Sequence, residues 1–223
     1  MAARSGLGLQ VEAWSAILYA DDERRLMGAV GTANDLPSSL RRRMPGFILD
    51  ATLCSLPLLR DRPESDLVYC SCNGDLAITA DLLTDLFRGE LLSPAKFSIS
   101  VHNAPAGMVG LAFAQIGNHT AIAGGPDSLA AGLTDAYARL ATGEAETVVL
   151  VFAEACLPEI YREFDEGGPN TFIALTLSAA AAAPEEAHWV EPGREGAAAL
   201  ARALDEGARA LRFAPPQWEA TPS

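Results

Sequence analysis

The sequence is poor in basic residues. It has 16 lysines and arginines against 29 aspartates and glutamates, which gives a formal net charge of −13 at neutral pH. The isoelectric point is near 4.6. Such a surface repels nucleic acid and anionic lipid, so we expect neither nucleic acid nor a membrane as a partner.

Cysteines and long hydrophobic runs are also scarce. The four cysteines have no zinc-finger spacing, and Cys70 and Cys72 alternate within a strand-like run. We therefore expect reduced thiols packed as small hydrophobic groups, and no metal site. The N-terminus has no basic segment followed by a long apolar run, and no stretch approaches the length of a membrane span. These absences predict a cytoplasmic protein.

Several motifs that carry chemistry are missing. There is no G-x-S-x-G, no phosphate-binding P-loop and no dinucleotide fingerprint, and Gly124-Gly125 alone is too weak a signal. We therefore expect no cofactor. The acidic runs at residues 21–23 and 163–166 are more typical of solvated loops than of acid/base pairs.

What is present is an ordinary globular composition: 223 residues, 49% hydrophobic and 20% charged. Short β-prone runs alternate with amphipathic segments, which predicts an α/β fold with helices on both sides of a mostly parallel mixed sheet. We expect a loop with short pieces of structure at 21–37. Strands are expected at 9–19, 67–71, 120–123, 147–152 and 171–177, and helices at 47–56, 77–87, 129–140 and 196–211.

The composition changes after the last of these strands. Five alanines run from 179 to 183, and the remaining chain is rich in Ala, Leu and Arg before an apolar, proline-rich tail. We expect one domain at 1–178 and a C-terminal extension at 179–223, with one helix packed on that same domain.

One stretch, residues 97–114, organises the chain. Its sequence is FSISVHNAPAGMVGLAFA. The period-two alternation at 97–101 predicts a strand, the small residues at 102–107 predict a tight turn, and the apolar run from Met108 predicts a helix. A strand, an elbow and a helix of this kind present one side chain, that of Asn103, at a helix N-terminus.

This stretch resembles the nucleophile elbow of the β-ketoacyl synthases of the thiolase superfamily. Residues 97–100 match the strand that precedes the catalytic cysteine, and Asn103 stands where that cysteine should be. Asparagine has no ionisable nucleophile and cannot carry an acyl thioester. The sequence SVHNA at 100–104 resembles more closely the short, cysteine-less synthase-like proteins known as chain length factors.

The resemblance implies half of a thiolase-like fold, covering about residues 9–177. It also implies a non-catalytic subunit that pairs with a β-ketoacyl synthase in a type II polyketide, aryl polyene or fatty-acid-like pathway. Neither histidine motif of a complete ketosynthase is present, because His102, His119 and His188 lie in other settings. An acidic acyl carrier protein would be repelled by a chain of net charge −13, so we expect it to dock on the partner.

The resemblance also assigns residues. The elbow comprises Val101, His102, Asn103 and Ala104. In thiolase-like dimers the strand before the elbow pairs across the two-fold axis, and the helix after it borders the partner's acyl channel. The candidates for the interface and the channel wall are then Phe97, Ile99, Gly107, Met108, Leu111 and Phe113.

Alternatives remain open. His102 beside Asn103 is better interpreted as a hydrogen-bonding elbow residue than as a base, because no obvious nucleophile lies next to it. Asn103 at a helix N-terminus could instead serve a stand-alone thioester decarboxylase or hydrolase. A homodimeric scaffold is a third hypothesis. The basic run at 41–43 fits a solvated helix face best, and a contact for a carrier protein or partner subunit is the alternative.

Overall fold

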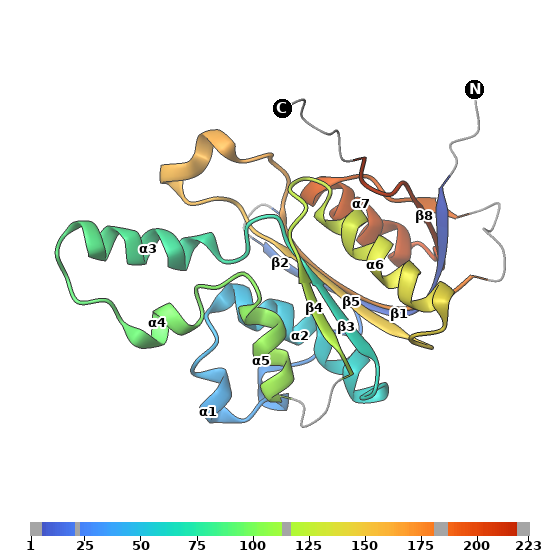
Figure 1. Cartoon of the computed structure of the whole chain (residues 1–223), viewed down its shortest axis with the longest axis horizontal. Coiled ribbons are helices and arrows are strands. Elements are labelled where there is room, and N and C mark those ends of the chain that lie inside the picture. Colours follow the sequence, from blue (N-terminus) through green and yellow to red (C-terminus); the bar gives the residue numbers. More distant parts are fainter. Residues whose placement is uncertain (1–5, 21–22, 113–116, 181–186, 218–223) are drawn as a thin grey trace.

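The computed structural model describes residues 6–20, 23–112, 117–180 and 187–217. In this part of the chain eight strands form one sheet, which lies between two layers of helices (Figure 1). The strands are β1 (Leu7–Ala20), β2 (Glu23–Gly28), β3 (Asp66–Cys70), β4 (His119–Ile122), β5 (Val148–Glu154), β6 (Asn170–Ala179), β7 (His188–Trp189) and β8 (Ala210–Phe213). The α-helices are α1 (Ser38–Arg41), α2 (Gly46–Asp61), α3 (Leu76–Phe87), α4 (Pro94–Ser98), α5 (Ala104–Ala112), α6 (Ser128–Thr142) and α7 (Gly193–Asp205), and the 3-10 helices are η1 (Ala33–Asp35) and η2 (Glu159–Phe164).

The sheet is mixed, as the sequence predicts. Its strand order is β4-β3-β5-β6-β1-β8-β7, and β2 pairs with β1. Parallel pairing is confined to β4–β3–β5 and to β7–β8, whereas the other described pairs are antiparallel. The expectation of a mostly parallel sheet therefore holds for the half that carries β3 and β5, and not for the half built on the long strand β1.

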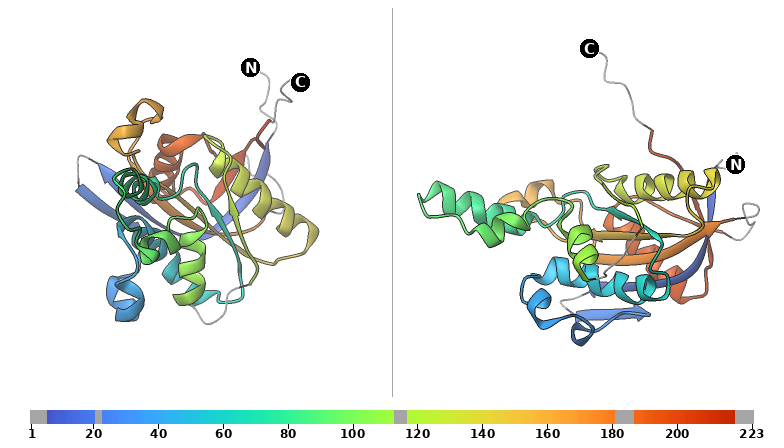
Figure 2. Two further views of the ribbon diagram at one scale, coloured as in Figure 1. Left: turned by 60° about the vertical axis from the view of Figure 1, so that its left-hand side comes forward. Right: turned by 60° about the horizontal axis from the view of Figure 1, so that its bottom comes forward.

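Each face of the sheet carries its own hydrophobic core. Helices α6 and α7 cover one face and α2 and α5 the other (Figure 2). Strand β5 contributes to both cores, with Leu150 on the α6 side and Val151 on the α2 side, and all seven of its residues are buried. The strand predicted at 147–152 is therefore confirmed, and it is buried on both faces.

Helix α2 does not end at Pro57, where the sequence predicts that its apolar run stops. It continues to Asp61 with the proline inside it. Proline lacks the N–H that would bond the carbonyl four residues earlier. That carbonyl, of Leu53, instead accepts a hydrogen bond from the backbone N–H of Gly31 at 2.9 Å. A neighbouring segment thus replaces the missing bond and lets the helix pass the proline.

The prediction of a strand at 97–101 is wrong. Residues Pro94–Ser98 form helix α4, and residues 99–103 continue as turns. The reason lies just upstream: Ser93 caps the helix by accepting a hydrogen bond from the Lys96 N–H at 3.3 Å, and Pro94 occupies the first turn. This cap-and-proline signal outweighs the period-two pattern. The described structure consequently offers no strand before the elbow for pairing across a two-fold axis.

The C-terminal extension contributes more than one helix. Strand β8 pairs with the start of β1, so the extension widens the main sheet, and α7 packs into the core on the α6 side. The helix expected at 196–211 ends at Asp205, and its last residues form β8 instead. Residues 181–186, which include most of the alanine run, and 218–223 lie outside the described residues.

Candidate functional site

The elbow lies at the start of α5. The Ala104 N–H donates to the Val101 carbonyl at 3.0 Å, and the Gly107 N–H donates to the Asn103 carbonyl at 3.0 Å. Asn103 therefore begins the helix, as predicted, although a helix and turns rather than a strand lead into it. Both Val101 and Asn103 are exposed. The tip of the elbow thus presents an amide side chain, next to an apolar one, at the surface of this chain.

His102 is directed inward. Its Nε2 lies 2.9 Å from the backbone carbonyl oxygen of Ser71, and its ring meets that of Tyr69 edge-on at 5.6 Å. Because a carbonyl oxygen only accepts, Nε2 must carry the proton. The predicted hydrogen-bonding role of His102 is confirmed. The ring anchors the elbow to the end of β3.

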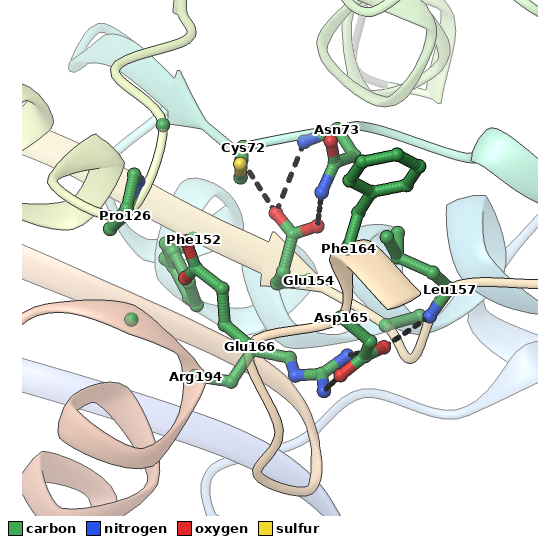
Figure 3. A pocket seen from close by; sticks show the side chains of 13 residues that line it. Cys72, Asn73, Pro126, Phe152, Glu154, Leu157, Phe164, Asp165, Glu166 and Arg194 are labelled. Atoms are coloured by element: carbon green, nitrogen blue, oxygen red, sulfur yellow. Dashed lines mark hydrogen bonds and ion pairs between the residues drawn. The ribbon is translucent and has the colours of Figure 1, made fainter. Parts of the chain in front are cut away.

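The segment that receives His102 is held by a buried carboxylate, Glu154, the last residue of β5 (Figure 3). Its Oε2 accepts from the Ser71 hydroxyl at 2.8 Å, from the Cys72 N–H at 2.5 Å and from the Asn73 N–H at 3.4 Å. Its Oε1 accepts from the Asn73 side-chain amide at 3.2 Å. Ser71 Oγ in turn accepts from the Gly74 N–H at 2.8 Å. One carboxylate therefore fixes the whole turn at 71–74.

Burial raises the pKa of Glu154, and the hydrogen bonds from Ser71, Cys72 and Asn73 oppose that shift. Sequence reasoning missed this residue. The sequence predicts that the strand ends at Phe152, whereas β5 continues for two more residues and ends at Glu154. An acidic residue directly after a fully apolar strand was the signal available.

A cavity of about 90 Å³ separates Glu154 from a second charged pair (Figure 3). Arg194 is almost fully buried, donates to the Gly167 carbonyl at 2.8 Å and pairs with Asp165. Burial raises the pKa of Asp165, but hydrogen bonds from Leu157, Gly167 and Arg194 outweigh it and leave the pKa below its ordinary value. The expectation of a solvated acidic run at 163–166 is therefore wrong for Asp165.

The candidate residues for the interface and channel wall divide into two groups. Phe97, Gly107 and Leu111 are exposed and Ile99 is partly buried, whereas Met108 lies within the core between α5 and α2. Phe113 lies outside the described residues. The exposed members are accessible to a partner in this structure, and Met108 is not.

Further exposed apolar side chains lie on an arm, which we define as α3, α4 and the connector 88–93. Figures 1 and 2 show α3 extending beyond the sheet. Asp75 caps α3, because its carboxylate accepts a hydrogen bond from the Ile78 N–H. The apolar face of α3 is nevertheless mostly exposed, because Leu82 is its one buried residue. The large exposed side chains of the arm are Leu83, Leu86, Phe87, Leu91, Leu92 and Phe97.

The cysteines behave mainly as packed thiols. Cys54 and Cys70 are buried, and burial raises the pKa of both. Cys72 is partly buried, and burial together with Glu154 raises its pKa to about 11, whereas Cys156 is exposed. No group of three metal-ligating side chains lies together among the described residues. The helices within that part of the chain are all too short or too polar to cross a bilayer.

The sequence and structure match known proteins. Residues 12–211 match the family described as "Beta-ketoacyl synthase, N-terminal domain". No curated protein sequence matches the chain. A structure of "Ketosynthase (ApeO) in Complex with its Chain Length Factor (ApeC) from Xenorhabdus doucetiae" superposes with a TM-score of 0.67 and 25% identity, over 78% of this chain and 80% of that chain.

Two more distant structures share the fold. "The ishigamide ketosynthase/chain length factor" gives a TM-score of 0.59 at 16% identity, over 79% of this chain and 63% of that one. The complex of AntDE with the type II polyketide synthase acyl-carrier protein AntF gives 0.56 at 13% identity, over 78% and 63%. The thiolase-like fold class is thereby confirmed. The description "cysteine-less" is wrong for the whole chain, which has four cysteines, and applies to the elbow position alone. Since the family match spans most of the sequence, this chain belongs to the β-ketoacyl synthase N-terminal domain family.

Proposed function

We propose that this chain is a non-catalytic subunit of the chain length factor type, which pairs with a β-ketoacyl synthase and bounds its acyl channel. The observation that carries the proposal is the surface around the elbow. An asparagine occupies the tip where a synthase needs a nucleophile, and exposed apolar side chains lie beside it on α5 and along the arm.

The arm supports pairing with another chain. Phe87 and Leu91 are almost completely exposed, and α3 buries little of its own apolar surface. Covering an aromatic side chain removes roughly 150–250 Å² from water, and apolar burial is worth about 25 cal/mol per Å². Several large apolar side chains exposed on one arm favour an interaction surface. A β-ketoacyl synthase is the proposed occupant, because the structure at 25% identity is a ketosynthase in complex with its chain length factor.

The thiol chemistry near the elbow supports a non-catalytic role. Asn103 cannot form a thioester. Cys72 lies behind the elbow, next to Glu154, and its pKa of about 11 keeps it as the thiol at neutral pH. A thiol in that state is a poor nucleophile. The proposed mechanism is steric: a growing acyl chain stops where further length would overpack the wall formed by α5.

The charge of the chain supports a division of labour. At a net charge of −13 it repels acidic carriers, so we place the docking of the acyl carrier protein on the partner. The basic run at 41–43 is small, and the guanidinium of Arg41 already donates to the Ala33 carbonyl at 3.2 Å. The SVHNA elbow favours a type II polyketide pathway of the aryl polyene kind or a fatty-acid-like pathway, with the complex working in the cytoplasm.

The test is co-expression with a β-ketoacyl synthase from the same genome, followed by size-exclusion chromatography and native mass spectrometry. The proposal predicts a one-to-one complex that Phe87→Ser or Leu91→Ser disrupts. The matched control is Arg88→Ser, which lies on the same arm and removes no apolar surface. If the complex forms equally well in all three variants, the partner does not bind the exposed apolar side chains of the arm.

A second candidate function rests on the exposure of Asn103 at the first turn of α5. Its amide could donate to a thioester carbonyl and assist decarboxylation of a malonyl carrier. Turnover by the isolated chain that disappears in Asn103→Ala would support that enzyme. The third hypothesis is a homodimeric scaffold. It predicts that the same native mass spectrum shows a stable dimer of this chain and no ketosynthase.

A further inference from the structure

A chain of contacts links the interior of the sheet to the elbow. It begins at the Glu154 carboxylate at the end of β5, passes through the turn at 71–74 and ends at His102. The carbonyl of Ser71 is the receiving group for the imidazole, and the hydroxyl and neighbouring N–H of the same turn are held by Glu154. The position of His102 therefore depends on a carboxylate that does not touch it.

The turn at 71–74 depends on the Glu154 carboxylate as the acceptor of its hydrogen bonds. Glu154 accepts hydrogen bonds from three donors at Oε2 and from one at Oε1, and Ser71 Oγ completes the turn by accepting from the Gly74 N–H. Without that carboxylate, buried N–H and O–H groups would lose their partners, and an unpaired buried donor is costly. Gly74, at φ +64°, lies against His102: a Cβ there would sit 3.5 Å from the His102 Cα.

We propose that Glu154 is a positioning residue for the elbow: by holding the turn at 71–74 it fixes the Ser71 carbonyl, and this sets where His102, Asn103 and the first turn of α5 stand. The consequence for acyl chain length rests on the proposed function. If α5 forms part of the channel wall, Glu154 sets the depth of that wall from the far side of the elbow.

The chemistry separates two substitutions of nearly equal size. A glutamine keeps one acceptor oxygen for the three donors at the Oε2 position, and the Asn73 amide can rotate to accept from the new NH₂ group. A methionine has no comparable acceptor and leaves those donors unpaired. Glu154→Gln should therefore preserve the elbow, and Glu154→Met should release it. If Glu154 only filled space, glutamine and methionine would have similar effects on the elbow, because the two side chains are of nearly equal size.

The first readout is the tautomer of His102, measured by ¹⁵N NMR on the full chain with labelled histidine and assigned with His102→Phe. In the wild type Nε2 carries the proton. Glu154→Met should move the tautomer ratio by about tenfold, the effect of losing one ordinary hydrogen bond, while Glu154→Gln stays near the wild type. His119 and His188 serve as internal references, and exposed Glu159→Gln is the control variant.

If Glu154→Met does not fold, Ser71→Ala decides. It removes the hydroxyl that bridges Glu154 and the Gly74 N–H but retains the carbonyl that receives His102. The same shift in tautomer ratio supports the proposal. A wild-type ratio in Ser71→Ala, or in a folded Glu154→Met, overturns it.

The second readout is the product-length distribution of the complex with the ketosynthase. Glu154→Met and His102→Phe should broaden it in the same way, and the double variant should add nothing, because both act through one contact. An unchanged distribution overturns the role in the channel. If the wild-type chain does not pair with a ketosynthase at all, the proposed function fails, and the NMR measurement still decides whether Glu154 positions the elbow.

Discussion

The guanidinium of Arg194 and the carboxylate of Asp165 form a doubly hydrogen-bonded ion pair, with Arg194 Nη1 3.2 Å from Asp165 Oδ2. The pair ties the start of α7 to the loop after β5, and the Arg194 side chain is 5% exposed. The C-terminal extension is thus joined to the rest of the fold by charge as well as by the sheet.

Asp165→Asn should lower the free energy of unfolding by about 3 kcal/mol at pH 7, because it leaves a buried guanidinium without its counter-charge. The pKa of Asp165 lies below its ordinary value of 3.8 in the folded chain. Its stabilising contribution is therefore complete above the unfolded value and is lost as the pH falls through the folded value.

Urea titrations at several pH values test this expectation. The difference between wild type and Asp165→Asn should be constant near neutrality and shrink below about pH 4. Asp81→Asn, in the exposed pair with Lys96, is the matched control and should change stability by less than about 1 kcal/mol. A difference that did not vary with pH would mean that the carboxylate charge is not what stabilises the loop.

The second prediction concerns Pro57 inside α2. Gly31 lies against that helix: a Cβ at Gly31 would sit 3.0 Å from the Leu56 Cβ and 3.2 Å from the Leu53 carbonyl oxygen. In Gly31→Ala the added methyl group should therefore weaken the hydrogen bond from the residue 31 N–H to the Leu53 carbonyl. We expect the free energy of unfolding to fall by about 1–3 kcal/mol. Gly46→Ala is the control, since open space surrounds that position.

Thermal unfolding of both variants decides the point. Pro57→Ala combined with Gly31→Ala should lose less stability than the single Gly31 variant, because alanine restores the N–H that bonds the Leu53 carbonyl within the helix. If Gly31→Ala lowers stability equally in the wild type and in Pro57→Ala, the hydrogen bond from Gly31 does not compensate for the proline.

The third prediction separates packing from gating on α5. Met108 is buried in the core and Leu111 is exposed. Met108→Ala should cost about 2–5 kcal/mol of stability through the cavity it leaves. Leu111→Ala should leave stability nearly unchanged and lengthen the products of the complex, because it lowers the proposed channel wall.

Product analysis and urea titration on the same two variants provide the check. Gly107→Ala extends the test in the opposite direction: it adds a methyl group into open space on the same helix and should shorten products if that face lines the channel. Identical product lengths in Leu111→Ala, Gly107→Ala and the wild type would contradict the gating mechanism.

Much of the fold could be predicted from the sequence because short apolar runs and helical periodicity decide it. The strand at β5 and the helix at α6 follow directly from burial on two faces and from helical periodicity. The helix α4 was missed because a short cap signal at Ser93-Pro94 competed with a period-two pattern five residues long. The capped helix forms, and the period-two pattern does not produce a strand.

The candidate site was predicted in part. The motif SVHNA located the elbow and its asparagine, because consecutive residues carry it. Glu154 lies 83 residues from Ser71, and only the parallel pairing of β3 with β5 brings the two together. Periodicity predicts that the apolar residues of α3 share a face, but it does not indicate what covers that face, and in the structure most of it is exposed.

The central claim, that the chain is a ketosynthase partner, is tested most directly by native mass spectrometry of the co-expressed pair. The account predicts a one-to-one complex with the ketosynthase, lost in Phe87→Ser and retained in Arg88→Ser, while the isolated Phe87→Ser chain unfolds at the wild-type urea concentration. A stable monomer or homodimer that ignores the ketosynthase would contradict it.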